Sequence, residues 1–175
     1  MPQTSLVLTI LGADRPGLVE SIASLVAEHQ GNWLESRMAH LAGQFAGILR
    51  VEVDAAQAES LTQALAGLAQ SGLETIIHPD PAAAAIPSDR PLVKLDLLGQ
   101  DRPGIVRQIS GVLAALGVNV EELNTECRAA AETGQPLFHA MADLRLPPDV
   151  SEEALRTALE NVAADLMVDV KLAVK

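Results

Sequence analysis

One segment of the chain occurs twice, and this repeat constrains the fold more than any other feature. Residues 12–17 (GADRPG) return 87 positions later as residues 99–104 (GQDRPG). Further matched pairs keep this offset: Val19 and Val106, Ile22 and Ile109, Ala27 and Ala114, and Asn32 and Asn119. Each copy is too long to be a solenoid repeat, which needs neighbouring repeats to bury its apolar face. The repeat therefore predicts two small domains.

Apolar residues make up 49% of the 175 residues, which is enough for two small hydrophobic cores. Aromatic side chains are nearly absent, since Trp33, Phe45 and Phe138 are the whole set. We therefore expect cores that are built from Leu, Val, Ile and Ala.

The first copy predicts four strands and two helices in the order βαββαβ. Residues 5–11 are apolar and β-branched, as a central strand requires, and residues 18–29 carry apolar side chains at helical spacing. A hairpin, a helix and a last strand follow, over residues 32–42 and 44–53, 55–70, and 74–77. This order is typical of the ferredoxin-like fold, in which two helices cover one face of an antiparallel sheet.

The second copy repeats the order, with a hairpin that is longer by about six residues near 130–135. Its expected strands cover residues 91–98, 119–129, 137–146 and 167–174, and its helices 105–116 and 151–165. We therefore expect an α+β protein of two ferredoxin-like βαββαβ modules, residues 1–78 and 92–175. The Pro- and Ala-rich residues 79–91 favour extended geometry and are expected to be a linker.

Polar residues and glycines predict where the first helix of each copy begins and ends. Asp14 and Asp101 suit helix N-caps, with the prolines two positions later in the first turn. Gly31 and Gly117 suit the left-handed residue that often follows a helix.

The net charge of −11 and the single cysteine limit the partners and the compartment. A chain this acidic gains no affinity from counterion release, so we expect no direct contact with nucleic acid. Cys127 alone cannot form an intrachain disulfide, which fits a reducing compartment. Without a basic leader segment or an apolar run of membrane-spanning length, we expect a cytoplasmic protein that does not contact membranes.

A strand that leads into Gly-x-Asp-Arg-Pro-Gly and a helix, with Asn32 or Asn119 opening the next strand, resembles the ACT family of sensor domains. The resemblance covers both copies and implies modules that pair side by side through their sheets. It also implies a small-molecule effector, usually an amino acid, at the pair interface, and a possible homodimer. Two modules with no catalytic partner resemble in particular the repressors of glycine cleavage genes, which implies contact with a transcriptional activator.

Carried onto this chain, the resemblance implies an effector site at the first strand–helix loop and the start of the second strand. Unpaired N–H groups and the positive dipole end of a helix suit a carboxylate there, and asparagine offers both a donor and an acceptor. The candidate effector-binding residues are Gly12, Ala13, Asp14, Arg15, Gly17 and Asn32 in the first copy, and Gly99, Gln100, Asp101, Arg102, Gly104 and Asn119 in the second.

The same loops also have a purely structural interpretation. The aspartate then only caps the helix, the proline only starts it, and the glycines only permit the turn. The two copies also differ beside the candidate site, because Trp33 follows Asn32 whereas Val120 follows Asn119. We therefore expect the first module to accept a smaller ligand than the second, or none.

The remaining residues predict no catalytic, metal or cofactor site. The four histidines lack metal-ligand spacing, and no nucleotide-binding or nucleophile motif occurs. Cys127 is expected to be a small strand residue whose thiol pKa is raised by the neighbouring Glu126. Glu121 and Glu122, also on this predicted strand, are expected to be solvated. The sequence therefore predicts a protein that is not an enzyme.

Two other functions stay open beside the repressor. One is a stand-alone regulatory subunit of an amino-acid or one-carbon metabolic enzyme. Modules of this type also resemble the N-terminal parts of formyltetrahydrofolate deformylase and of some phosphoserine phosphatases, which carry a catalytic domain after the module. The other is a general amino-acid sensor with no role in transcription.

The charge generates a first testable prediction, that the protein alone does not bind promoter DNA. The net charge of −11 repels the phosphate backbone, and the few aromatic side chains are too isolated to stack bases. A gel-shift titration at low salt, the most permissive condition, is expected to give no shift. Saturable binding at micromolar concentration would show that the contact with DNA is direct.

Overall fold

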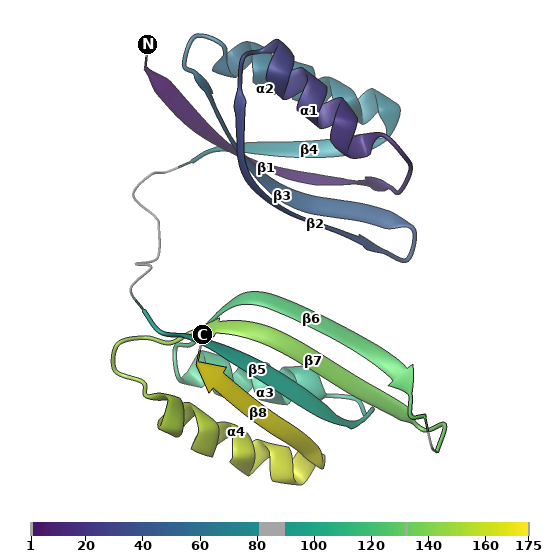
Figure 1. Ribbon diagram of the computed structural model, residues 1–175, viewed down its shortest axis with the longest axis vertical. Coiled ribbons are helices and arrows are strands. Elements are labelled where there is room, and N and C mark those ends of the chain that lie inside the picture. The colour runs from purple at the N-terminus through teal and green to yellow at the C-terminus, as the bar shows by residue number, and fades with distance from the viewer. Residues whose placement is uncertain (1, 81–89, 132, 175) are drawn as a thin grey trace. The chain divides into compact units, whose positions relative to one another are not determined.

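The computed structural model describes residues 2–80, 90–131 and 133–174. The chain divides into two compact units, Met1–Ala85 and Ile86–Lys175, called here the first and second modules. Each module is a four-stranded antiparallel sheet with its helices on one face (Figure 1). The prediction of two ferredoxin-like modules is confirmed. The predicted linker falls for the most part on residues 81–89, which lie outside the described residues.

The first module follows the predicted order of elements, and its sheet has the strand order β2-β3-β1-β4. Its elements are β1 (Gln3–Ala13), α1 (Leu18–Glu28), β2 (Asn32–Leu41), β3 (Gln44–Asp54), α2 (Ala58–Ala66), the short 3-10 helix η1 (Gly67–Ser71) and β4 (Leu73–Pro79). The central strand β1 leads directly into the GADRPG loop, so this loop lies at one end of the sheet.

The second module has the equivalent strand order, β6-β7-β5-β8. Its elements are β5 (Leu92–Gln100), α3 (Ile105–Ala115), β6 (Asn119–Ala129), β7 (Pro136–Arg145), α4 (Glu152–Leu166) and β8 (Val168–Val174). Ser151 caps α4 as its position predicts, because its Oγ accepts a hydrogen bond of 3.1 Å from the N–H of Ala154. The strands β2 and β6 are edge strands of their sheets.

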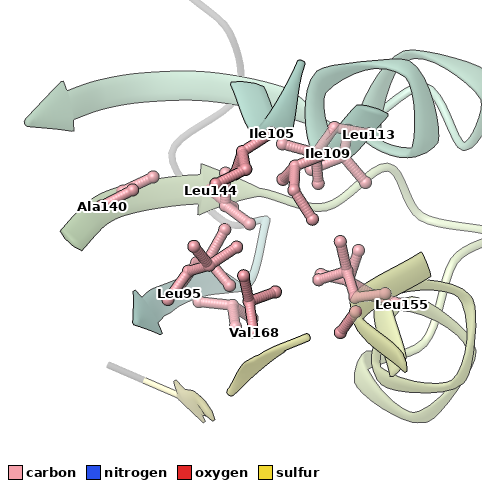
Figure 2. Packing of buried hydrophobic residues seen from close by; sticks show 14 of the residues in the cluster. Leu95, Ile105, Ile109, Leu113, Ala140, Leu144, Leu155 and Val168 are labelled. Atoms are coloured by element: carbon pink, nitrogen blue, oxygen red, sulfur yellow. The ribbon is translucent and has the colours of Figure 1, made fainter. Parts of the chain in front are cut away.

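Each module has its own core, formed where the apolar faces of the helices pack on the inner face of the sheet. In the first module Leu8, Ile22 and Leu61 are fully buried. In the second, side chains from α3, α4 and the strands point toward one another, with Leu144 and Leu155 fully buried (Figure 2). Both cores consist mainly of Leu, Ile, Val and Ala, as expected from the composition.

The predicted N-caps of α1 and α3 are wrong. Gly17 and Gly104 occupy the N-cap positions with φ values of 91° and 96°, and no side chain caps either helix. The aspartates remain on the strand side of the loop instead. The N–H of Asp14 donates to the carbonyl of Gly43 at 2.9 Å, and that of Asp101 to the carbonyl of Pro136 at 3.0 Å. The prolines consequently lie before the helices.

Two further helix ends differ from the prediction. Gly117, the second residue after the end of α3, has the expected left-handed conformation. Gly31 is the third residue after the end of α1, so in the first module Gln30 adopts this conformation instead. The helix expected from residue 55 begins at Ala58. The carboxylate of Asp54 accepts a hydrogen bond from the N–H of Ala56, so a turn precedes the helix.

One glycine in each module permits a close approach between the end of the first strand and the start of the last. A Cβ at Gly12 would lie 2.5 Å from the carbonyl oxygen of Gly72, and a Cβ at Gly99 would lie 2.9 Å from that of Met167. Real Cβ atoms are not found this close to a backbone oxygen. The candidate residues Gly12 and Gly99 are therefore required by packing.

We expect Gly12→Ala to lower the free energy of unfolding by about 1–3 kcal/mol, because the backbone at Gly72 must shift. Gly111→Ala, in α3, is the control. A Cβ there meets no atom within 4 Å, so the variant is expected to gain about 0.5–1 kcal/mol. Urea unfolding of the full chain, followed by circular dichroism, measures both. A Gly12→Ala variant as stable as the parent would refute the packing requirement.

Candidate functional site

The arginine of each loop reaches the end of the last helix in its module. Arg15 Nη2 donates to the carbonyl of Ser71 at 3.1 Å, and Arg102 Nη1 donates to the carbonyl of Asp165 at 3.3 Å. Carbonyls in a last turn lack helical partners, and the negative dipole end favours a cation. Both arginines thus bind the loop to the end of the last helix of the module. This contact was not predicted, because its partners lie 56 and 63 residues away.

The aspartate of each loop faces the second strand of the same module. Asp14 Oδ2 lies 3.5 Å from Nε2 of His40, and Asp101 forms a side-chain hydrogen bond with Cys127. His40 and Cys127 are 87 positions apart, so they occupy matching places in the two modules. The two loops therefore have one arrangement with different partners for the carboxylate.

The pKa of the Cys127 thiol is raised, first by desolvation and then by the charge and the hydrogen bond of Asp101. The predicted direction is confirmed, but the predicted carboxylate is wrong. Glu126 Oε1 lies 3.5 Å from Nδ1 of His139 instead. Side chains alternate across a strand, so the residue next to Cys127 in the sequence points away from it.

The starts of α1 and α3 are open to solvent. A Cβ at Gly17 would meet no atom within 4 Å, and one at Gly104 would meet only Nε2 of Gln108 at 3.9 Å. The N–H groups of a first helical turn have no partner within the helix and favour an anion. Ala13 pairs with Gln44 at the end of the sheet, and the Gln100 side chain donates to that of Gln135 at 3.0 Å. Both helix starts are therefore exposed and have first-turn N–H groups of the kind that favour an anion.

The structure does not bring the two asparagines close to the loops of their own modules. Asn119 pairs with Arg145, which pairs with Leu92 at the start of β5, whereas the loop follows the end of this strand at Gln100. At about 3.3 Å per residue, this separates Asn119 from the loop by roughly 25 Å. Asn32 is placed in the same way, beside Glu52. One module alone therefore cannot combine loop and asparagine in one site.

A second candidate site is a hollow of about 580 Å³ over the outer face of the second sheet, away from the helices. Lysine and carboxylate side chains lie around Met141 there, namely Lys94, Asp96, Glu122, Asp143 and Lys171. The cross-strand register places Asp96 opposite Lys171 and Lys94 opposite Asp143, so charges of opposite sign already face one another.

Within residues 2–80, 90–131 and 133–174, no three or more His, Cys, Asp and Glu side chains are arranged to hold a metal ion. In the same part of the chain, no helix has the length and apolar character that are needed to cross a membrane.

Comparison with known proteins gives the family. Residues 4–76, nearly the whole first module, match the family model of the ACT domain. The second module repeats its strand order, its glycine N-cap and its loop contacts. The chain is a tandem ACT-domain protein.

Two solved structures extend over both ACT modules. An unknown protein from Galdieria sulphuraria has a TM-score of 0.88 and 30% identity, covering 99% of each chain. A protein provisionally named a glycine cleavage system transcriptional repressor has a TM-score of 0.70 and 18% identity, covering 100% of this chain and 99% of that one. At 18% identity the latter likeness concerns the fold alone.

Among curated proteins, a UPF0237 protein of Methanopyrus kandleri is 40% identical over 53 residues. The matched segment covers 30% of the tandem ACT-domain protein and 59% of that relative. The match therefore spans less than two thirds of the relative.

The Asp101–Cys127 contact generates a prediction about thiol reactivity. Because Asp101 raises the pKa of Cys127, Asp101→Asn is expected to lower this pKa and to increase the thiolate fraction at pH 8. Alkylation by iodoacetamide at pH 8 is then faster than in the parent. Asp14→Asn, the matching change in the first module, is the control and leaves the rate unchanged. Equal rates for Asp101→Asn and the parent would contradict the contact.

Proposed function

We propose that the tandem ACT-domain protein is a non-enzymatic regulator that binds a small amino-acid effector at its strand–helix loops. The observation that carries the proposal is that both loops are held by the same contacts. In each, an aspartate N–H is bound to the hairpin and an arginine to the end of the last helix. The open helix start beyond Gly17 or Gly104 remains for a ligand.

The groups around each loop match the two charged ends of an amino acid. The carboxylate would accept hydrogen bonds from the first-turn N–H groups of α1 or α3, at the positive dipole end. The ammonium group would face the carboxylate of Asp14 or Asp101, which lies on the strand side of the same loop. Because Arg15 and Arg102 are bound to helix ends, they would position the loop rather than pair with the ligand.

A second copy of the chain would complete the site. The residues of β6 are exposed along its whole length. Among the described residues of the second module, no strand pairs with the outer edge of β6. In an antiparallel pairing of β6 with β6 of another copy, the start of one strand lies beside the end of the other. Asn119 of one copy would then approach the loop of its partner, which would explain why the two are far apart within one module.

Because two copies would share the effector site, effector binding would change how the copies pair. This change of pairing would alter the surface that other proteins contact. We propose that the partner is a transcriptional activator of glycine cleavage genes and that the protein restrains it without contacting DNA. The two-module fold shared with the provisionally named repressor supports this proposal. The single cysteine fits a reducing cytoplasm, where we place the activity.

A thermal-shift screen of the amino acids tests the effector. A ligand at about 100 times its Kd adds roughly 2.7 kcal/mol of stability, which raises Tm by roughly 5–10 °C in a chain of this size. Asn119→Ala is expected to abolish the shift. Asn124→Ala is the matched control, since both asparagines lie on β6 and donate to a glutamate two residues away at 2.8 Å.

The outcomes separate the two candidate sites. No shift with any amino acid at millimolar concentration would refute the proposed function. A shift that is lost in Asn124→Ala and kept in Asn119→Ala would move the site to the hollow on the outer face of the sheet, which Asn124 lines.

A further inference from the structure

The outer face of the first sheet, turned away from α1 and α2, carries large apolar side chains in contact with solvent (Figure 1). Leu11, Ile48 and Ile76 lie on this face, on β1, β3 and β4, and are 47%, 56% and 59% exposed. The cross-strand register places Thr9 between Ile48 and Ile76 in one row across the sheet. Leu11, Ile48 and Ile76 together form the apolar patch of the first module.

The fold does not require this patch, because the second module has the same sheet with charged side chains at matching places. The row of Ile48, Thr9 and Ile76 corresponds there to one apolar and two charged side chains, Met141, Asp96 and Lys171. A sheet of this kind therefore folds with charges on its outer face. Apolar side chains that gather in solvent without being needed by the fold are typical of a surface that contacts another molecule.

Charges of opposite sign lie at the two edges of the same face. Arg37, on the edge strand β2, pairs across the sheet with Ile48, and Glu74, on the edge strand β4, pairs with Leu11. Neither Arg37 nor Glu74 forms an ion pair with another residue in the described part of the chain. The apolar patch is therefore flanked by a cation on one side and a carboxylate on the other.

We propose that the outer face of the first sheet docks on the same face of a second copy of the chain. In a two-fold pairing whose axis is parallel to the strands, the sheets pack face to face, and β2 of each copy lies over β4 of the other. The two Ile48 side chains then flank the axis. Arg37 of each copy comes within reach of Glu74 of the other, so both unpaired charges gain a partner.

The same charges exclude the other face-to-face arrangement. A two-fold axis that crosses the strands would place β2 of one copy over β2 of the other and would bring the two Arg37 side chains together. Like charges placed opposite one another are destabilising. The face is thus complementary to itself in one orientation only, which is what an interface between identical surfaces requires.

The size of the face predicts a weak dimer. The shortest strand, β4, has 7 residues. A four-stranded face of this length measures roughly 19 by 23 Å, so two copies would cover roughly 900 Å² between them. This is below the roughly 1,200 Å² of stable interfaces, and we expect an association that depends on concentration. The face belongs to the first module, so this inference does not rest on the proposed effector site or on the pairing of β6.

Sedimentation equilibrium of the full chain at about 10–500 µM, without added amino acid, tests the proposal. We expect the parent chain to self-associate. Ile48→Lys is expected to weaken the association at least about tenfold, because it places two like charges beside the axis. Met141→Lys is the matched control, since Met141 has the equivalent place in the second sheet and is 48% exposed. It is expected to leave the association unchanged.

A charge exchange tests the orientation. Arg37→Glu is expected to weaken the association about two- to fivefold, and Arg37→Glu combined with Glu74→Arg is expected to restore it. If Ile48→Lys does not fold, as judged by its Tm, Ile76→Lys replaces it, because the second module carries a lysine at that place.

Three outcomes would overturn this inference. They are a parent chain that stays monomeric, an association that survives the lysine in the apolar patch, and a double charge variant that associates no better than Arg37→Glu. Each leaves the proposed function intact, because that function depends on the strand–helix loops and on β6.

Discussion

A close approach of two backbone segments at one glycine determines the arrangement of each module. At Gly12 the first strand passes so near the carbonyl of Gly72 that no Cβ fits, and at Gly99 the first strand of the second module also passes too near the carbonyl of Met167 for a Cβ. This approach places the end of the last helix beside the loop that follows the first strand. The loop arginine can then reach the helix carbonyls. The shape of the loop is therefore set by the fold, before any ligand is considered.

Both loops are built by the same contacts, and they differ in the side chains around them. The aspartate faces His40 in the first module and Cys127 in the second. The strand that follows the first helix carries Trp33 in one and Val120 in the other. The repeat thus gives one backbone arrangement with two different sets of neighbouring side chains. This difference explains how two similar modules can have unequal roles.

The fold could be predicted from the sequence because the repeat gives two independent readings of the same hydrophobic pattern. The N-caps could not be predicted in the same way. An aspartate before a proline fits the N-cap preference, but the sequence does not show whether its N–H is bound to the hairpin, as that of Asp14 is. The partner of Cys127 was missed for a similar reason. Its neighbour Glu126 is adjacent in sequence, whereas Asp101 comes close only through the register of three strands. The contact of Arg102 could not be predicted either, because the sequence does not show that the end of α4 lies beside this loop.

Hydrogen–deuterium exchange of the full chain, with and without a saturating concentration of the amino acid that raises its Tm most, tests most directly whether the second loop is the effector site. The amides of residues 99–106 and 119–125 are expected to exchange more slowly with this amino acid, because the ligand covers the start of α3 and orders the edge strand β6. Residues 12–19 are expected to be protected less, since Trp33 follows Asn32 in the first module and leads us to expect a smaller ligand there, or none. Protection confined to residues 12–19, or to the outer sheet face at residues 94–96 and 171–173, would contradict this account.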